Sequence, residues 1–130
     1  MQAVSERELS DLQSLYADFQ KEDAEIYAVS DNSVSDHKKW VASSERIDQV
    51  NYPLLADNNH ILAKMFASFD EESNETCPGT FIICPGRKFK AFELNTTGIA
   101  RDAQPILKML RSVKDLRKNK NSTCSISCQR

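Results

Sequence analysis

The stretch GTFIICPGRKFKAFEL, residues 79–94, decides the fold that the sequence predicts. Residues 80–84 are a run of strongly β-forming side chains, and Pro85 and Gly86 form a dipeptide typical of a turn. Residues 89–94 are again rich in aromatic and apolar residues and can return beside the first run. We therefore expect an antiparallel β-hairpin here.

A helix and a strand are expected near the start of the chain. Apolar residues recur there at helical spacing: Leu9, Leu12, Leu15, Tyr16 and Phe19. Ser5 and Glu8 form the S-x-x-E pattern of a capping box, which predicts that the helix opens at Ser5. Residues 25–30 follow as a short apolar run and are predicted to form a buried strand.

Two further steps of helix and strand lead to the hairpin. Ser35 is expected to cap a short helix, residues 43–49 to add a helical turn, and residues 52–55 to form a short strand. Asn58 or Asn59 is expected to cap the next helix. Its predicted inner face is apolar: Ile61, Leu62, Met65, Phe66 and Phe69.

The sequence ends with a helix and a polar tail. Residues 70–76 read as a polar loop, and residues 102–118 as a helix with Pro105 in its first turn. The helix turns apolar residues inward: Ile106, Leu107, Leu110 and Val113. The whole order is α-β-α-β-α-β-β-α, which predicts an α/β layer architecture. We expect one domain over residues 1–118 and a polar tail over residues 119–130.

The composition excludes several classes of function. The 130 residues are 40% hydrophobic and 28% charged, as in one ordinary globular domain, and the net charge is −2. That balance argues against a nucleic-acid-binding protein, and the basic residues from 111 to 120 are expected to form a solvated helix face. With no apolar run long enough for a membrane span and no visible signal peptide, we expect a cytoplasmic protein without membrane contact.

Four cysteines and two histidines are spaced without a metal-binding pattern. Cys77, Cys84, Cys124 and Cys128 show no paired C-x2-C spacing, and the histidines at 37 and 60 lie far from them in sequence. Three glycines are too few for a phosphate-binding loop. We therefore expect no metal and no cofactor. In a reducing compartment the four thiols stay free or serve redox chemistry.

With its elements placed, the chain resembles the peroxiredoxins of the alkyl hydroperoxide reductase (AhpC) branch. The order and spacing of several segments carry the resemblance: residues 8–19, IYAVS at 26–30, HKKW at 37–40, YPLLAD at 52–57, GTFII at 79–83, PG at 85–86 and TGIAR at 97–101. It implies a thioredoxin-like fold and a thiol peroxidase without a cofactor. In that family a cysteine in a V-C-P-T-E motif attacks the peroxide, becomes a sulfenic acid and forms a disulfide with a resolving cysteine of the partner subunit. Thioredoxin or a similar reductant then restores it.

This sequence departs from the family at the reacting position. VSEREL, residues 4–9, stands where the family has V-C-P-T-E-L, so Ser5 replaces the peroxidatic cysteine and Glu6 replaces the proline. Pro78 stands where the family has an arginine, and Cys84 where it has an aspartate. A serine hydroxyl remains protonated near neutral pH and has no sulfenic state. The resemblance therefore implies a site that has lost its nucleophile.

Other positions of the resemblance are kept. Glu8, Trp40 and Arg101 match family positions around the pocket, and Cys124 matches the resolving cysteine. Cys77 is the candidate for a relocated reactive thiol, although no Lys, Arg or His is close to it in sequence. Cys84 is expected on the core side of its strand. Cys124 and Cys128 read either as two thiols of a mobile tail or as a local redox pair. Trp40 is expected to pack, and His37 to lie at the surface.

A central strand of the family is also missing from the sequence. The family places an apolar strand before the catalytic cysteine, and here only residues 1–4 precede Ser5. Several buried side chains at about 1.5–3 kcal/mol each would be lost with that strand. We expect the chain to fold only partly alone, or to close the gap by repacking its sheet or by accepting a strand from a partner.

Three functional hypotheses follow. The first is an inactive peroxiredoxin-family scaffold that pairs with a peroxiredoxin subunit, as a homo- or heterodimer. The second is an active thioredoxin-dependent peroxidase or thiol–disulfide oxidoreductase that uses Cys77 or Cys124. The third is a gene fragment without a selected function. The sequence favours the first, because the thiol on which the family's chemistry depends is absent from its position.

Overall fold

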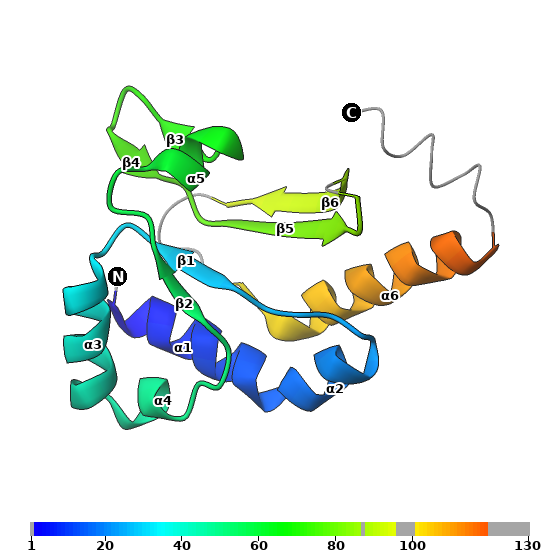
Figure 1. The fold of residues 1–130 in the computed structure, drawn as a ribbon, viewed down its shortest axis with the longest axis horizontal. Coiled ribbons are helices and arrows are strands. Elements are labelled where there is room, and N and C mark those ends of the chain that lie inside the picture. The colour runs from blue at the N-terminus through cyan, green and yellow to red at the C-terminus, as the bar shows by residue number, and fades with distance from the viewer. Residues whose placement is uncertain (1, 87, 96–100, 120–130) are drawn as a thin grey trace.

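The computed structural model describes residues 2–86, 88–95 and 101–119 (Figure 1). Its first two elements are consecutive helices. Helix α1 spans Gln2–Ser14 and α2 spans Tyr16–Lys21, with the break at Leu15. The expected apolar face is present, and Phe19 on α2 is buried. The capping-box prediction is wrong: α1 already begins at Gln2, so Ser5 lies inside the helix and caps nothing.

A βαβ unit follows, as the sequence predicts. Its elements are β1 (Ala28–Ser30), α3 (Val34–Ser43), α4 (Glu45–Asp48) and β2 (Leu54–Ala56). The two strands are parallel, and Val29 is the partner of Leu55 in their register. A parallel strand is normally covered on both faces, yet Val29 is 44% exposed, so the expected burial of this strand is wrong.

The start of α3 differs from its prediction by two residues. The cap is Ser33 and not Ser35, since the Ser33 hydroxyl accepts the backbone N–H of Asp36 at 3.2 Å. His37, which the sequence places at the surface, is buried. It faces β1, where its Nε2 lies 2.5 Å from Oγ of Ser30.

The next helix is short, and its buried face is not the predicted one. Helix α5 spans Ile61–Met65, and its first N–H groups, of Leu62 and Ala63, donate to the two carboxylate oxygens of Asp57 at 3.0 and 2.9 Å. Asn58 and Asn59 therefore do not cap it. Ala63 is buried, whereas Ile61 and Met65 are exposed. Ile61 and Met65, four residues apart, share the outer face of the helix, while Leu62, Phe66 and Phe69 are half-buried.

Two antiparallel hairpins complete the strands. Within the segment expected to be a loop, β3 (Phe69–Asp70) pairs with β4 (Glu75–Thr76). The predicted long hairpin is confirmed: β5 (Gly79–Cys84) pairs with β6 (Lys88–Leu94), with a register shift after Ile82. Four rings gather on one face of this hairpin and on the end of α5: Phe66, Phe81, Phe89 and Phe92.

The last described element is the predicted helix. Helix α6 spans Ala103–Asn119 and contains Pro105 in its first turn. Leu107 and Val113 are buried, and Val113 packs with Ile82 and Cys84 of β5 in a core cluster. The polar tail expected over residues 119–130 lies outside the described residues beyond Asn119, together with Cys124 and Cys128.

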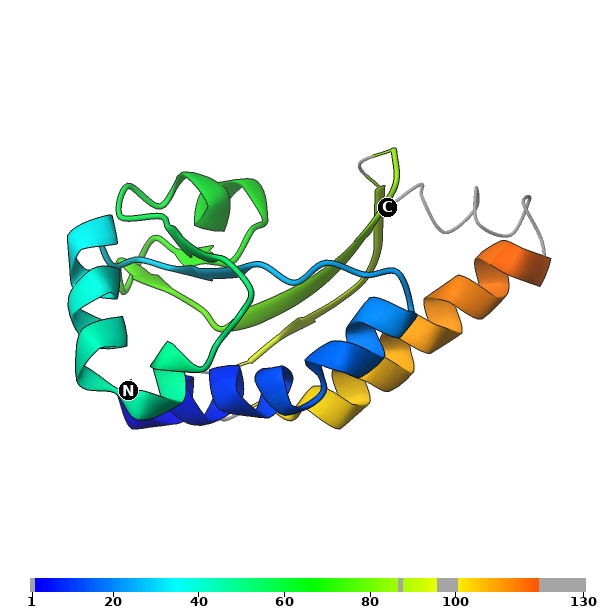
Figure 2. The same cartoon turned by 60° about the horizontal axis from the view of Figure 1, so that its bottom comes forward.

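The strands form a discontinuous middle layer. Figure 2 shows α1, α2 and α6 along one side of the strands, with α5 on the opposite side. Within the described ranges the strands form three separate two-stranded sheets, β1–β2, β3–β4 and β5–β6, and no ladder joins them. In the same part of the chain, none of the helices is long and apolar enough to cross a bilayer.

Helix α1 holds the two halves of this layer together. On one side the Glu6 carboxylate accepts from Trp40 of α3, the Leu9 carbonyl accepts from Tyr52, and the Gln13 side chain accepts from the N–H of Asn51. On the other side Glu8 and Asp11 accept hydrogen bonds from the chain around β5 and α6. The spacing 6, 9, 13 and the spacing 8, 11 place these two sets on opposite faces of one helix.

Candidate functional site

Glu8 and Arg101, which the sequence analysis singled out separately, form an ion pair that is largely buried. Glu8 is 8% exposed on α1. Its Oε2 accepts the backbone N–H of Arg101 at 2.9 Å and the Nε of the same residue at 2.5 Å, and its Oε1 accepts Nη2 at 3.3 Å. A guanidinium held by one carboxylate through two nitrogens of the same edge has a fixed orientation.

The free edge of the guanidinium reaches the first residues of β5. Nη1 of Arg101 donates to the carbonyl of Gly79 at 2.5 Å and lies 3.3 Å from Oγ1 of Thr80. Gly79 suits this position because a Cβ there would lie 2.9 Å from both Leu94 and Phe81 side-chain atoms. Arg101, which lies 93 residues after Glu8 in the sequence, thus links α1 to the start of the hairpin.

Ser5 lies one helical turn before Glu8, in the position that the resemblance gives to the reacting residue. It is half-buried in α1, and residues three apart on a helix are neighbours on its surface. A hydroxyl at this point can donate or accept a hydrogen bond, but it cannot supply a thiolate. The structure therefore places a serine hydroxyl one helical turn from a carboxylate that a guanidinium holds.

Trp40 contacts the site indirectly. Its indole Nε1 donates to Oε1 of Glu6 at 2.9 Å, and this bond connects α3 to the second turn of α1. The sequence prediction that Trp40 packs is compatible with this contact. Glu6 was noted in the sequence only because it stands where the family has a proline, and its contact with Trp40 was not predicted.

The described cysteines lie apart from one another. Cys84 is buried in the core cluster, as expected. Cys77 is half-buried between β4 and β5, and its backbone N–H donates to the carbonyl of Ser68 at 2.7 Å. It stands two residues before Gly79, whose carbonyl receives Arg101. Cys124, the predicted resolving residue, lies outside the described residues.

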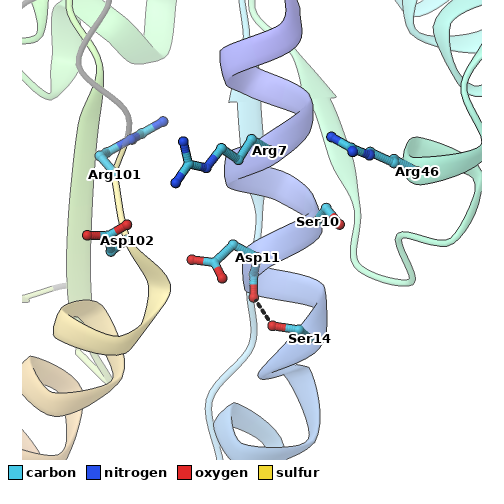
Figure 3. A pocket seen from close by; sticks show the side chains of 7 residues that line it. All are labelled: Arg7, Ser10, Asp11, Ser14, Arg46, Arg101 and Asp102. Carbon is cyan, nitrogen blue, oxygen red and sulfur yellow. Dashed lines mark hydrogen bonds between the residues drawn. The ribbon is translucent and has the colours of Figure 1, made fainter.

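A cavity of about 290 Å³ adjoins the ion pair and was not predicted from the sequence (Figure 3). Seven residues line it: Arg7, Ser10, Asp11, Ser14, Arg46, Arg101 and Asp102. The first four share one face of α1, which helical spacing could have revealed. Arg46 comes from α4 and Asp102 from the residue before α6, and no local pattern joins them to α1.

The surroundings of the site are polar without metal-ligand geometry. Across residues 2–86, 88–95 and 101–119, no three histidine, cysteine or acidic side chains lie close enough together to hold a metal ion.

Tyr52, which anchors α1 through the Leu9 carbonyl at 2.6 Å, has its pKa raised well above the ordinary value because burial disfavours the phenolate.

Comparison with known proteins identifies the family. The AhpC/TSA family model matches residues 2–92. Alkyl hydroperoxide reductase C of Bacillus subtilis (strain 168) is 34% identical over 121 residues, which are 93% of this chain and 65% of the relative. The protein of the same name from Amphibacillus xylanus is 31% identical over 93% of this chain and 64% of its own length. The chain thus spans just under two thirds of these relatives.

Solved structures agree with the sequence comparison. The crystal structure of Enterococcus faecalis AhpC superposes with a TM-score of 0.86 at 35% identity, covering 89% of this chain and 70% of that one. The mitochondrial 2-Cys peroxiredoxin of Plasmodium falciparum has a TM-score of 0.81 at 22% identity, covering 88% and 69%, and shows the shared thioredoxin-like fold. The expected fold is therefore confirmed, and the chain belongs to the AhpC/TSA family.

Proposed function

We propose that residues 1–118 form a peroxiredoxin-family scaffold that has lost the peroxidatic thiol, does not reduce peroxides and acts as an interaction partner of an intact peroxiredoxin. The observation that carries the proposal is Ser5, which occupies the reacting position one turn before the Glu8–Arg101 pair. The first step of the family's reaction breaks the O–O bond by attack of a thiolate, which becomes a sulfenic acid. A serine cannot be oxidised in this way.

Open strand edges support the role of an interaction partner. β1 and β5 each pair on one side with β2 and β6, and no ladder joins them within the described residues. Exposed apolar side chains stand on these strands, with Val29 44% and Ile83 49% exposed. An unpaired edge offers backbone N–H and C=O groups to an added strand. A peroxiredoxin subunit with a free apolar segment is the partner that we propose.

Peroxide consumption by the purified chain, with thioredoxin, thioredoxin reductase and NADPH, tests the loss of activity. We expect NADPH oxidation no faster than in the absence of the chain, while native-like near-UV dichroism from Trp40 shows that the protein is folded. Turnover that disappears when Cys77 or Cys124 is changed to serine would contradict the proposal and identify a relocated nucleophile.

Partner binding is tested separately by native mass spectrometry of the chain mixed with an intact alkyl hydroperoxide reductase C. We expect a complex that contains both chains. Replacing Val29 by lysine places a charge on the open strand and is expected to weaken the complex. Lysine at Val34, which is 59% exposed on α3, is the matched control and should leave it intact.

The second candidate function is a thiol peroxidase or thiol–disulfide oxidoreductase that uses Cys77. The observation in its favour is the position of Cys77, two residues before the carbonyl that binds Arg101. In such a cycle the Cys77 thiolate takes one peroxide oxygen and releases water or an alcohol. A second thiol, such as that of Cys124, then displaces water to form a disulfide, and thioredoxin reduces it. Trapping of a Cys77 sulfenic acid by dimedone after peroxide addition would favour this candidate.

A further inference from the structure

One face of the β5–β6 hairpin is apolar and largely exposed to solvent. In the register of the two strands Phe81 is the partner of Phe92, and Ile83 is the partner of Phe89. Partner residues of an antiparallel pair point to the same side, so these side chains share one face. Together with Leu94, the partner of Gly79, they form the surface that we call the open hairpin face: Phe81, Ile83, Phe89, Phe92 and Leu94. None of these side chains is charged.

The opposite face of the hairpin is already covered by a helix. Ile82 and Cys84 are buried there in a cluster with Val113 of α6, and Ala91 of β6 packs against the same cluster. Figure 2 shows α6 on this side of the strands and α5 on the other side. Because α6 closes one face, a further layer can be added to the hairpin only on the open hairpin face.

Helix α5 covers one end of the open hairpin face and leaves the rest exposed. The ring of Phe66, which ends α5, lies 5.0 Å from the ring of Phe81 and 5.4 Å from the ring of Phe89, measured between centroids. Beyond these contacts Phe92 is 62% exposed, Ile83 49% and Leu94 42%. Rings and branched chains that are exposed to this extent would gain hydrophobic free energy from a partner surface.

The exposed part of this face is large enough for a small interface. An aromatic side chain can bury about 150–250 Å², so the exposed fractions of the face correspond to about 400 Å² of apolar surface per copy. A contiguous apolar patch of a few hundred Å² is typical of an interaction site. Two such faces with the polar rim around them would bury about 1,000 Å² in total, which is the lower limit for a specific interface.

We infer that the open hairpin face binds the same face of a second copy of this chain, so that two hairpins stack across a twofold axis. A face without charge requires a partner surface that is equally apolar and uncharged, because an unpaired charge buried against it would be costly. The chain itself presents such a surface, of equal size. Identical surfaces that meet across a twofold axis form the most common type of oligomer contact. In stacked sheets the side chains of the two inner faces interdigitate, as these rings and aliphatic chains can.

The inference does not rest on the proposed function. It uses the side chains of one hairpin face, whereas the complex with an intact peroxiredoxin is proposed to form through the backbone groups of open strand edges. Its test therefore uses the purified full chain alone, without peroxide and without another peroxiredoxin. The two proposals can fail separately.

Sedimentation equilibrium over a range of concentrations tests the inference. We expect a reversible equilibrium of monomer and dimer with a dissociation constant on the order of 100 µM, as suits an interface near the lower size limit. Raising the NaCl concentration about tenfold should leave the dissociation constant unchanged or lower it, because the open hairpin face contains no charges for salt to screen.

Three lysine variants locate the interface. Phe92→Lys and Ile83→Lys each place an ammonium group in the stacked face and should raise the dissociation constant at least tenfold. Val34→Lys, at a residue of α3 that is 59% exposed, is the matched control and should leave the dissociation constant unchanged. All three side chains are largely exposed in the single chain, so near-UV dichroism from Trp40 should match that of the native chain.

Three results would overturn the inference. A chain that sediments as a monomer even at about 1 mM, ten times the expected dissociation constant, would show that a second copy does not occupy this face. A dimer that both Phe92→Lys and Ile83→Lys leave intact would be formed through another surface, such as a strand edge. Equal weakening by Val34→Lys would show unspecific association of exposed apolar side chains.

Discussion

Replacing Arg101 by methionine should be among the most destabilising single changes in this chain. The substitution keeps most of the side-chain length and removes the guanidinium that holds Glu8, whose side chain is only 10% exposed. Removing one partner of a buried ion pair leaves the other charge without compensation and typically costs about 3–5 kcal/mol. The bonds from Nη1 to the Gly79 carbonyl and the Thr80 hydroxyl are lost as well. Because a domain of this size is stable by only about 5–15 kcal/mol, the effect should be large.

Glu8→Gln provides the other half of a double-mutant cycle. The amide can still accept the backbone N–H of Arg101, which lies 2.9 Å from Oε2 in the native chain, so this change should cost less, about 1–3 kcal/mol. The double variant removes both charges and should be more stable than the sum of the two losses predicts. A coupling free energy of about 2 kcal/mol is expected for charges in direct contact.

Urea unfolding followed by Trp40 fluorescence measures these differences. Arg111→Met is the matched control, because Arg111 pairs with Glu22 at 3.4 Å while its side chain is 51% exposed. An exposed pair contributes about 0–1 kcal/mol, and salt reduces it further. If Arg101→Met cost no more than Arg111→Met, or if the cycle showed no coupling, the argument that this ion pair joins α1 to the hairpin would fail.

Three other experiments test separate parts of the structure. Tyr52→Phe removes the bond to the Leu9 carbonyl and should cost about 1 kcal/mol. Burial raises the Tyr52 pKa above its ordinary value of 10.0, so the stability that the protonated phenol contributes is complete below pH 10 and is lost progressively above it. The urea midpoint of the variant should therefore decline less steeply at alkaline pH than that of the native chain. An equally steep decline would contradict this reasoning. Asp57→Ala removes both acceptors at the start of α5 and should cost about 1–2 kcal/mol, whereas Asn58→Ala should have little effect on the same urea midpoint. Iodoacetamide should label Cys77 faster than the buried Cys84 in the folded chain, and peptide mass spectrometry showing equal rates would contradict the described burial.

Periodicity predicted the elements that pack through many side chains at once. The predictions of the hairpin over residues 79–94 and of the helix from Ala103 were correct. In each element the pattern, alternation in the strands and helical spacing in the helix, repeats over many residues. The βαβ order was also predicted correctly, although β1 and β2 are only three residues long, because apolar β-forming residues mark both strands. Burial of Val29 was predicted wrongly, because burial depends on what lies beside a strand and the strand's own pattern does not contain that information.

Caps and site contacts were harder to predict. The path of the backbone into each helix determines which side chain accepts its first N–H groups. At α3 this is Ser33 and not Ser35, and at α5 it is Asp57 and not Asn58 or Asn59. Both alternatives have suitable side chains, so residue type alone could not decide. The family resemblance singled out Glu8 and Arg101 as residues of the pocket, but it did not predict that they form an ion pair. The approach of Arg46 to α1 depends on how two distant helices pack, and no short motif encodes it.

The contacts on the two faces of α1 determine how the molecule unfolds locally. Contacts at Glu6, Leu9 and Gln13 hold the β1–β2 half, while Glu8 and Asp11 hold the half built from β5, β6 and α6. With no ladder between those halves in the described chain, fraying of α1 would release each half as its own cooperative unit. Amide hydrogens of Leu55 and Ile82 should then exchange with deuterium through openings of different free energy, and a substitution on one face of α1 should accelerate exchange in only one of the two halves.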